Sequence, residues 1–300
     1  TIRNKMKKLT AILAVFFAAT ILPVHAADTK TMAIIDTGVD VQHPAIKSNI
    51  VYEVCIAGYK SCPNGTNFQE GAGSATITPT MYSNTAWHHG TKVASAATQT
   101  DPNIKIIEIR CASLIGTNGY LGCNYDMFNL ALNWVINNQN KFNIGAVVSP
   151  IGALSSSCNL SAPYVTSINK LLSSQVAVIL PTGNDFNYSN IDNPACVPGV
   201  IAISAIDDKG RLALYANYSS RVDFASQGNL NVAIPGGTYK NDYGTSLSVA
   251  TFGANWLKIL NTKNLSYTDQ YNLIKNTSTP YTNIMVKKNV LAINIVKALQ

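Results

Sequence analysis

The sequence has few charged residues, and past residue 26 it has no apolar run long enough to span a bilayer, no lysine and arginine cluster and no CxxC pair. These absences argue against a membrane span, nucleic-acid binding and a CxxC-type metal site in that part of the chain. The formal net charge of +7 includes four basic residues and no acidic ones within residues 1–26, so the remainder carries 7 − 4 = +3. The apolar share of 47% is ample for a sizeable core.

Residues 1–26 have the pattern of a secretory signal peptide. Basic residues between Arg3 and Lys8 precede an apolar run from Leu9 to Val24, and the small residues around His25 predict cleavage after Ala26. We therefore expect a secreted or periplasmic protein. Residues 27–300 contain no repeat or polar linker, and we expect them to form one domain and a monomer.

The cysteines are even in number, as expected for disulfides in an exported protein. They are Cys55, Cys62, Cys111, Cys123, Cys158 and Cys196. The sequence does not decide the pairing. We favour bonds between successive cysteines, because short loops close most easily.

Short apolar runs alternate with helical patterns from Thr31 onward. The runs cover 32–35, 104–109, 144–148, 175–180 and 200–205, and the helical patterns cover 89–98, 125–138, 162–173 and 246–259. Strands that are apolar on both faces and separated by helices predict an α/β fold of three layers, a mostly parallel β-sheet with helices on both faces. Residues 50–86 have the composition of an irregular surface segment, and two outer helices are expected at 268–275 and 286–299.

Ser246 is predicted to lie on the first turn of a buried helix, directly after the irregular turn at 243–245. A hydroxyl there is held rigidly, and the free amides and positive dipole end of the helix can stabilise an oxyanion. The simpler interpretation is a helix-capping serine, which needs no further partners. A nucleophile would need a base, an orienting acid and a second oxyanion donor elsewhere in the chain.

Three further patterns supply such groups. Asp36 stands where an apolar strand meets Thr37-Gly38, His89 begins a helical pattern, and Asn184 follows an apolar strand in Thr-Gly-Asn. Functional residues of parallel sheets gather at the carboxyl ends of strands, where Asp36 and Asn184 are expected. Each pattern alone also fits an ordinary turn or cap.

The chain order Asp, His, Ser is that of subtilisin, and the sequence resembles the subtilase family of serine peptidases. The resembling segments are Ile35–Asp40 with His43-Pro44, His89–Ala94, Gly183–Asp185, Asn193–Ser204, Tyr215–Ser219 and Gly244–Ser246. The resemblance implies a subtilisin-like fold and peptide-bond hydrolysis through an acyl-enzyme. It implies Ser246 as nucleophile, His89 as base, Asp36 as its orienting acid and Asn184 as oxyanion-hole donor. It implies a protein or peptide substrate and no cofactor.

The chain also departs from the family pattern. Ala250 replaces a proline, Lys92 a histidine, and Ala45 an aspartate that binds calcium in some members, so no metal site is predicted. Residues 148–152 resemble the substrate-pairing strand, which makes Ser149 and Gly152 expected substrate-binding residues, although Pro150 lacks an amide to donate.

Two more expectations follow from the resemblance. Asp185 is expected near the primary specificity pocket, where it would favour a basic side chain. A prosegment, common in the family, is not recognisable between residue 26 and the first strand.

Two alternative functions are weighed against the serine peptidase. Asp-Thr-Gly is also the aspartic-peptidase signature, but that mechanism needs two carboxylates, and this chain has the motif once. A catalytically silent binding protein on the subtilase fold would account for Ala250, Pro150 and the lack of a recognisable prosegment. The presence of Asp36, His89, Asn184 and Ser246 together favours a working enzyme.

Overall fold

The computed structural model describes residues 29–115, 120–283 and 288–300. The predicted signal peptide lies outside these residues. At the centre is a ten-stranded sheet in the order β15-β16-β12-β11-β9-β7-β1-β4-β2-β3. Its strands are β1 (Thr31–Asp36), β2 (Ile50–Ile56), β3 (Phe68–Glu70), β4 (Lys105–Arg110), β7 (Ile144–Val148), β9 (Ala177–Pro181), β11 (Ile201–Ile206), β12 (Phe224–Gln227), β15 (Thr279–Asn283) and β16 (Lys288–Ala292). Strands β3 and β15 pair antiparallel at the two edges, and the other pairings are parallel.

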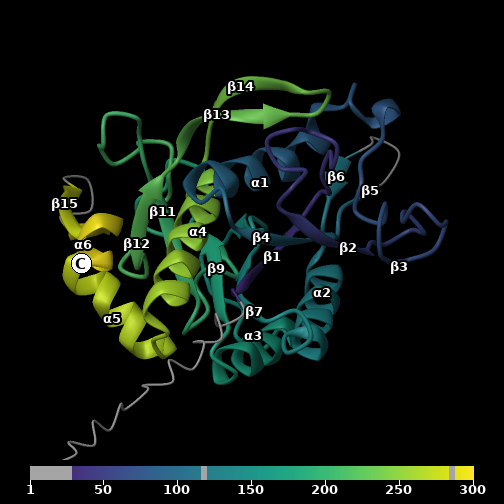
Figure 1. Ribbon diagram of the computed structural model, residues 1–300. Coiled ribbons are helices and arrows are strands. Elements are labelled where there is room, and N and C mark those ends of the chain that lie inside the picture. Colours follow the sequence, from purple (N-terminus) through teal and green to yellow (C-terminus); the bar gives the residue numbers. More distant parts are fainter. Residues whose placement is uncertain (1–28, 116–119, 284–287) are drawn as a thin grey trace, which may run out of the picture.

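Helices cover both faces of the sheet, which confirms the predicted three-layer α/β fold (Figure 1). The helices are α1 (His89–Thr100), α2 (Tyr125–Asn138), α3 (Pro163–Ser173), α4 (Thr245–Lys263), α5 (Tyr267–Thr277) and α6 (Ile295–Leu299), with short 3₁₀ helices η1 (Pro79–Met81) and η2 (Thr85–His88). In β1, Met32 and Ile34 pack with α1 and α4, whereas Ala33 and Ile35 pack with α2 and α3. Successive side chains of a strand face opposite sides, so a continuous apolar strand fills both cores.

Small paired strands lie outside the main sheet. The hairpins are β5 (Ser113–Ile115) with β6 (Tyr120–Gly122) and β13 (Asn229–Ile234) with β14 (Thr238–Tyr243), and the third pair is β8 (Ala153–Leu154) with β10 (Asp192–Asn193). The pairing of β8 with β10 brings residues about forty positions apart in sequence into contact.

The described residues form the three disulfides that were predicted. They join Cys55 to Cys62, Cys111 to Cys123, and Cys158 to Cys196. The second bond ties the end of β4 to the residue after β6, so it anchors the β5–β6 hairpin to the main sheet. No helix of the described residues is long and apolar enough to cross a membrane.

Two sequence predictions about secondary structure were wrong. Residues 50–56, expected to be irregular, form the sheet strand β2, because Val54 and Ile56 are buried against β4. The helix expected over 286–299 is absent from its described part before residue 295, where 288–292 form β16. Val290 and Ala292 are buried at alternate positions, a period that fits a strand and not a helix.

Candidate active site

The four polar residues singled out in the sequence all lie beyond the carboxyl ends of the parallel strands or at the helix starts beside them. Asp36 ends β1, His89 begins α1, Asn184 follows β9 by three residues, and Ser246 is the second residue of α4. Helices α1 and α4 pack against each other on the same face of the sheet. The fold therefore gathers the predicted site residues at one edge of the sheet.

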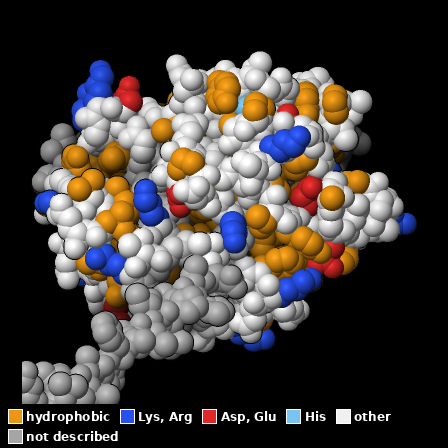
Figure 2. All heavy atoms as spheres, in the orientation of Figure 1, with side chains coloured by type: hydrophobic (Ala, Val, Ile, Leu, Met, Phe, Trp, Pro, Cys, Tyr) orange, Lys and Arg blue, Asp and Glu red, His pale blue; other side chains and the backbone are white. Residues whose placement is uncertain are grey.

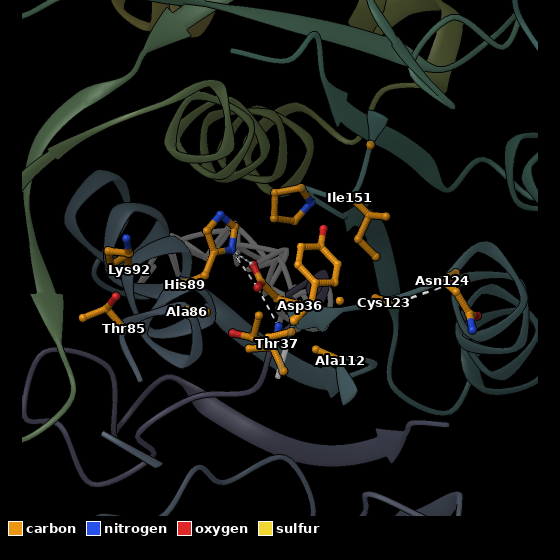
Figure 3. A pocket seen from close by; sticks show the side chains of 15 residues that line it. Asp36, Thr37, Thr85, Ala86, His89, Lys92, Ala112, Cys123, Asn124 and Ile151 are labelled. Atoms are coloured by element: carbon orange, nitrogen blue, oxygen red, sulfur yellow. Dashed lines mark hydrogen bonds and ion pairs between the residues drawn. The ribbon is translucent and has the colours of Figure 1, made fainter. Parts of the chain in front are cut away.

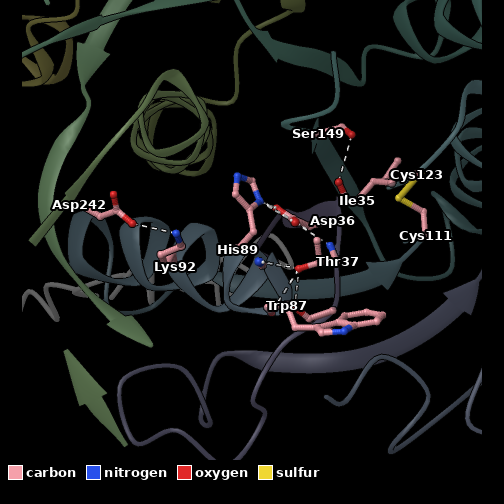
Figure 4. A network of polar contacts seen from close by, with 12 residues as sticks. Ile35, Asp36, Thr37, Trp87, His89, Lys92, Cys111, Cys123, Ser149 and Asp242 are labelled. Atoms are coloured by element: carbon pink, nitrogen blue, oxygen red, sulfur yellow. Dashed lines mark hydrogen bonds and ion pairs between the residues drawn. A yellow bond between two sulfur atoms is a disulfide. The ribbon is translucent and has the colours of Figure 1, made fainter. Parts of the chain in front are cut away.

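Asp36 and His89 form a direct contact. The Nδ1 atom of His89 lies 2.8 Å from Oδ1 and 3.0 Å from Oδ2 of Asp36. Asp36 is 3% exposed and also accepts the amide hydrogen of Thr37, at 2.6 Å. With the carboxylate accepting, His89 donates from Nδ1, and its Nε2 is left as the acceptor on the side away from Asp36 (Figure 4).

The start of α1 is tied to the same turn. The backbone amide of Gly90 donates to the hydroxyl of Thr37, at 3.0 Å. One turn further along α1, Nζ of Lys92 forms an ion pair with Oδ2 of Asp242 at 2.8 Å, so α1 is bonded to the strand that leads into α4 (Figure 4). The lysine that departs from the family pattern thus has a local structural partner.

Asn184 is fixed at the start of α4. Its Oδ1 accepts from the backbone amide of Thr245 at 2.9 Å and from the Thr245 hydroxyl at 3.0 Å. Since the carbonyl oxygen is used in this way, the Nδ2 group remains available as a donor beside the first turn of the helix.

Ser246 is half-buried on that turn. No residue in the described part of the chain forms a hydrogen bond with its hydroxyl, and that includes His89. The structure thus brings Asp36 to His89 and Asn184 to the start of α4, without a hydrogen bond that joins the two pairs. Catalytic hydrogen bonds are often absent without substrate and form in its complex.

A cleft of about 540 Å³ opens over Asp36 and His89. On one side lie η2 and α1, and on the other lie Pro150, Ile151 and Gly152, which follow β7 (Figure 3). Strand β6, Cys123 and Asn124 also line the cleft, together with Thr37 and Ala112. Gly152 therefore reaches the cleft, as expected for a substrate-binding residue.

Ser149 does not reach the cleft. It is 0% exposed, and its hydroxyl donates to the carbonyl oxygen of Ile35 at 3.1 Å. Its side chain joins β7 to β1, and Ser149 is not among the residues that line the cleft. Asp185 is exposed beside Asn184, where its backbone amide and carboxylate both bond the side chain of Asn217.

The sequence predictions missed two buried carboxylates near the site, Glu108 and Asp192. Glu108 is 0% exposed, and neither carboxylate oxygen has a hydrogen-bond partner among the described residues. Burial first, and then the charges of Asp36 and Glu53, raise the pKa of Glu108 well above its usual range, and the nearby backbone of Gly38 opposes this only in part. An acidic residue inside the apolar run 106–109 was the available sequence signal.

Charged side chains are dispersed over the face shown in Figure 2, with lysine and arginine separated from one another. This dispersion agrees with the sequence, which lacks a basic cluster.

Comparisons with known proteins extend the resemblance. A family model described as the Subtilase family matches residues 28–282. Subtilisin amylosacchariticus of Bacillus subtilis subsp. amylosacchariticus is 25% identical over 233 residues, which make up 75% of this chain and 53% of the relative. The chain thus spans about half the length of such curated relatives.

Solved structures share the fold. The epidermin leader peptide processing serine protease of Staphylococcus aureus matches with a TM-score of 0.73 and 18% identity, over 93% of this chain and 76% of that one. A cold adapted subtilisin-like serine proteinase matches with a TM-score of 0.66 and 20% identity, over 87% of both chains. At these identities the likeness shows the fold alone.

Proposed function

We propose, from the premise that the chain belongs to the subtilase family, that it is an exported serine endopeptidase that hydrolyses peptide bonds through an acyl-enzyme on Ser246. The observation that carries this proposal is the contact of His89 with the buried carboxylate of Asp36 at the floor of the cleft. A carboxylate in that place sets the imidazole tautomer that a general base needs.

The proposed reaction begins with proton transfer from the Ser246 hydroxyl to Nε2 of His89. The serine oxygen attacks the scissile carbonyl carbon, and Asp36 stabilises the imidazolium that forms. His89 then protonates the leaving amine, the C–N bond breaks, and an acyl-enzyme remains. Water, deprotonated by His89, attacks the ester and releases the new carboxyl terminus.

Two donors would stabilise the oxyanion of the tetrahedral intermediate. One is Nδ2 of Asn184, held beside α4 by its bonds to Thr245, and the other is the backbone amide of Ser246 on the first turn. The positive end of the α4 dipole acts in the same direction. Donors that are held in position before reaction need little reorganisation, and the bonds to Thr245 support such a role for Asn184.

Export is part of the proposal. Three disulfides within the described residues support it, because such bonds persist in oxidising compartments.

Labelling with a fluorophosphonate, which reacts with an activated serine, tests the proposal. We expect wild type to be labelled and Ser246→Ala to be silent. Ser248→Ala is the matched control, because Ser248 lies on the same helix but is fully buried, and it should label like wild type. A folded wild type that neither labels nor cleaves any peptide would instead support the silent binding protein.

A further inference from the structure

Asp192 lies on β10, next to residues that wall the cleft. The pairing of β10 with β8 sets Asp192 opposite Leu154, two residues beyond Gly152. A Cβ atom on Gly152 would lie 2.8 Å from Oδ2 of Asp192, and a Cβ atom on Gly183 would overlap Oδ1. The carboxylate therefore fits between two backbone segments only because both residues are glycine.

These two segments belong to different parts of the proposed site. Gly152 lines the cleft over His89, and Gly183 directly precedes the oxyanion donor Asn184. If Asn184 holds the carbonyl of a substrate residue, the side chain of that substrate residue would lie close to Gly183, which precedes Asn184 in the chain. The Asp192 carboxylate is the group that a Cβ atom on Gly183 would meet, and Asp185 directly follows Asn184 in the chain.

The side-chain amide of Asn217 donates to both carboxylates, and neither carboxylate has a cationic partner among the described residues. Nδ2 of Asn217 donates to Oδ2 of Asp185 at 2.9 Å and to Oδ1 of Asp192 at 3.2 Å. None of the ion pairs within the described residues includes either aspartate. Oδ2 of Asp192 takes no hydrogen bond from any residue that the structure describes, although Asp192 is only 8% exposed.

Such an arrangement is costly without a further partner. Burial, and then the charge of Asp185, raise the pKa of Asp192 to about 7. A purely structural role would be met by the bond from Asn217 to Oδ1, and would not require the second oxygen to face Gly152. Buried carboxylates are ordinarily paired with a cation or with several donors.

We propose that Asp192, assisted by Asp185, is the specificity determinant that binds an arginine or lysine side chain on the residue whose carbonyl is attacked. This inference rests on the proposed peptidase function. Asp185, exposed at the rim, attracts the cation, and Asp192 receives it beside the glycines. The guanidinium fork of arginine matches two carboxylates better than the single ammonium of lysine does, so arginine is preferred.

The test uses peptides that are identical except at this one residue, which is arginine, lysine, leucine or citrulline, the uncharged analogue of arginine. For wild type we expect kcat/KM to be at least about 30-fold higher for arginine than for citrulline, the fold-change typical of a buried charge pair. Asp192→Asn, which keeps the shape and the bond to Asn217, should remove the preference for arginine over citrulline. Asp185→Asn should reduce the ratio in part.

Asp269→Asn, which removes an exposed charge on α5, is the matched control and should keep the wild-type ratio. The comparison of arginine with citrulline in wild type needs no variant to fold. Equal cleavage of the two by wild type, or an arginine preference that persists in Asp192→Asn, would overturn the inference.

A binding measurement separates this inference from the proposed function. Calorimetry with wild type compares two acetylated peptides that end in arginine or in citrulline and resemble cleavage products. Tighter binding of the arginine peptide, lost in Asp192→Asn, supports the specificity site whether or not turnover occurs. Equal binding defeats it. Missing fluorophosphonate labelling, by contrast, defeats the peptidase proposal alone.

Discussion

Glu108→Gln should change how the stability of the fold depends on pH. Glu108 stands in the middle of β4, fully enclosed, with Ile34 of β1 and Glu53 of β2 as its register partners. Its carboxylate oxygens have no partner among the described residues, whereas those of Glu53 accept from Gly73, Ala75 and Thr76. Glu108 therefore holds a proton in the folded protein under conditions where the unfolded chain releases it.

The direction of the effect follows from linkage. The pKa of Glu108 is raised by burial first, so its stabilising contribution is complete below the unfolded pKa of about 4.3 and is lost as pH rises through the folded pKa. While the folded form keeps the proton and the unfolded form has lost it, unfolding free energy falls by about 1.4 kcal/mol for each pH unit. Glutamine does not titrate, so the unfolding free energy of Glu108→Gln should lack this fall with rising pH.

Urea unfolding without reductant, from pH 5 upward, measures the difference. The stability of Glu108→Gln relative to wild type should rise with pH by about 1.4 kcal/mol per unit until Glu108 ionises in the folded protein. The raised pKa of Asp192 adds a slope of the same sign, but it is common to both proteins and cancels.

Asp208→Asn, which removes an exposed charge, serves as the control for loss of charge alone and should follow wild type. If wild type and Glu108→Gln keep parallel stability curves over this range, Glu108 is ionised in the fold and the reasoning fails.

Three more predictions follow from the site. Asn184→Ala should lower kcat by roughly 10²- to 10³-fold with a small change in KM, because the oxyanion forms only during reaction; steady-state kinetics would show a larger effect on KM if Asn184 bound substrate instead. Replacing both Cys111 and Cys123 by serine should reduce unfolding free energy by about 3 kcal/mol and raise KM, since the hairpin that lines the cleft loses its anchor; an unchanged KM would contradict that role. Gly183→Ala should abolish cleavage of arginine peptides, because its φ of +99° is unfavourable for alanine and the added methyl displaces Asp192; thermal melts separate this effect from unfolding.

The sequence predicted the central strands and the major helices because their signals are local. The run around Ile34 is apolar at every position, and the first turn of α4 falls where the pattern after Gly244 predicts it. Strands β13 and β14 were not predicted, because β13 begins with Asn-Leu-Asn and β14 is polar and largely exposed. Their formation depends on pairing with each other and on the packing of β13 against α1.

In the candidate site, too, residues with local sequence signals were predicted, and contacts that depend on strand pairing were not. The resemblance, carried by chain order and short motifs, selected Asp36 and His89, which the structure joins by a hydrogen bond. The resemblance of residues 148–152 to a substrate-pairing strand also selected Ser149. The burial of its side chain was not predictable, because the bond to Ile35 depends on the register of β7 beside β1. Asp192 was missed because its contact with Gly152 spans forty residues and has no local pattern.

Glu108 and Asp192 show that burial alone does not decide what a carboxylate near this site does. Both are enclosed and both have a raised pKa. Glu108 lies within the sheet, both its oxygens are buried without a partner among the described residues, and it does not line the cleft. Asp192 lies between two glycines, one of which lines the cleft, and one of its oxygens is left without a partner among the described residues. A bound arginine would replace its proton and return the pKa of Asp192 below 7, whereas no peptide should alter Glu108. Proton release on binding, measured in buffers of different ionisation enthalpy, should therefore depend on Asp192 and be unchanged in Glu108→Gln.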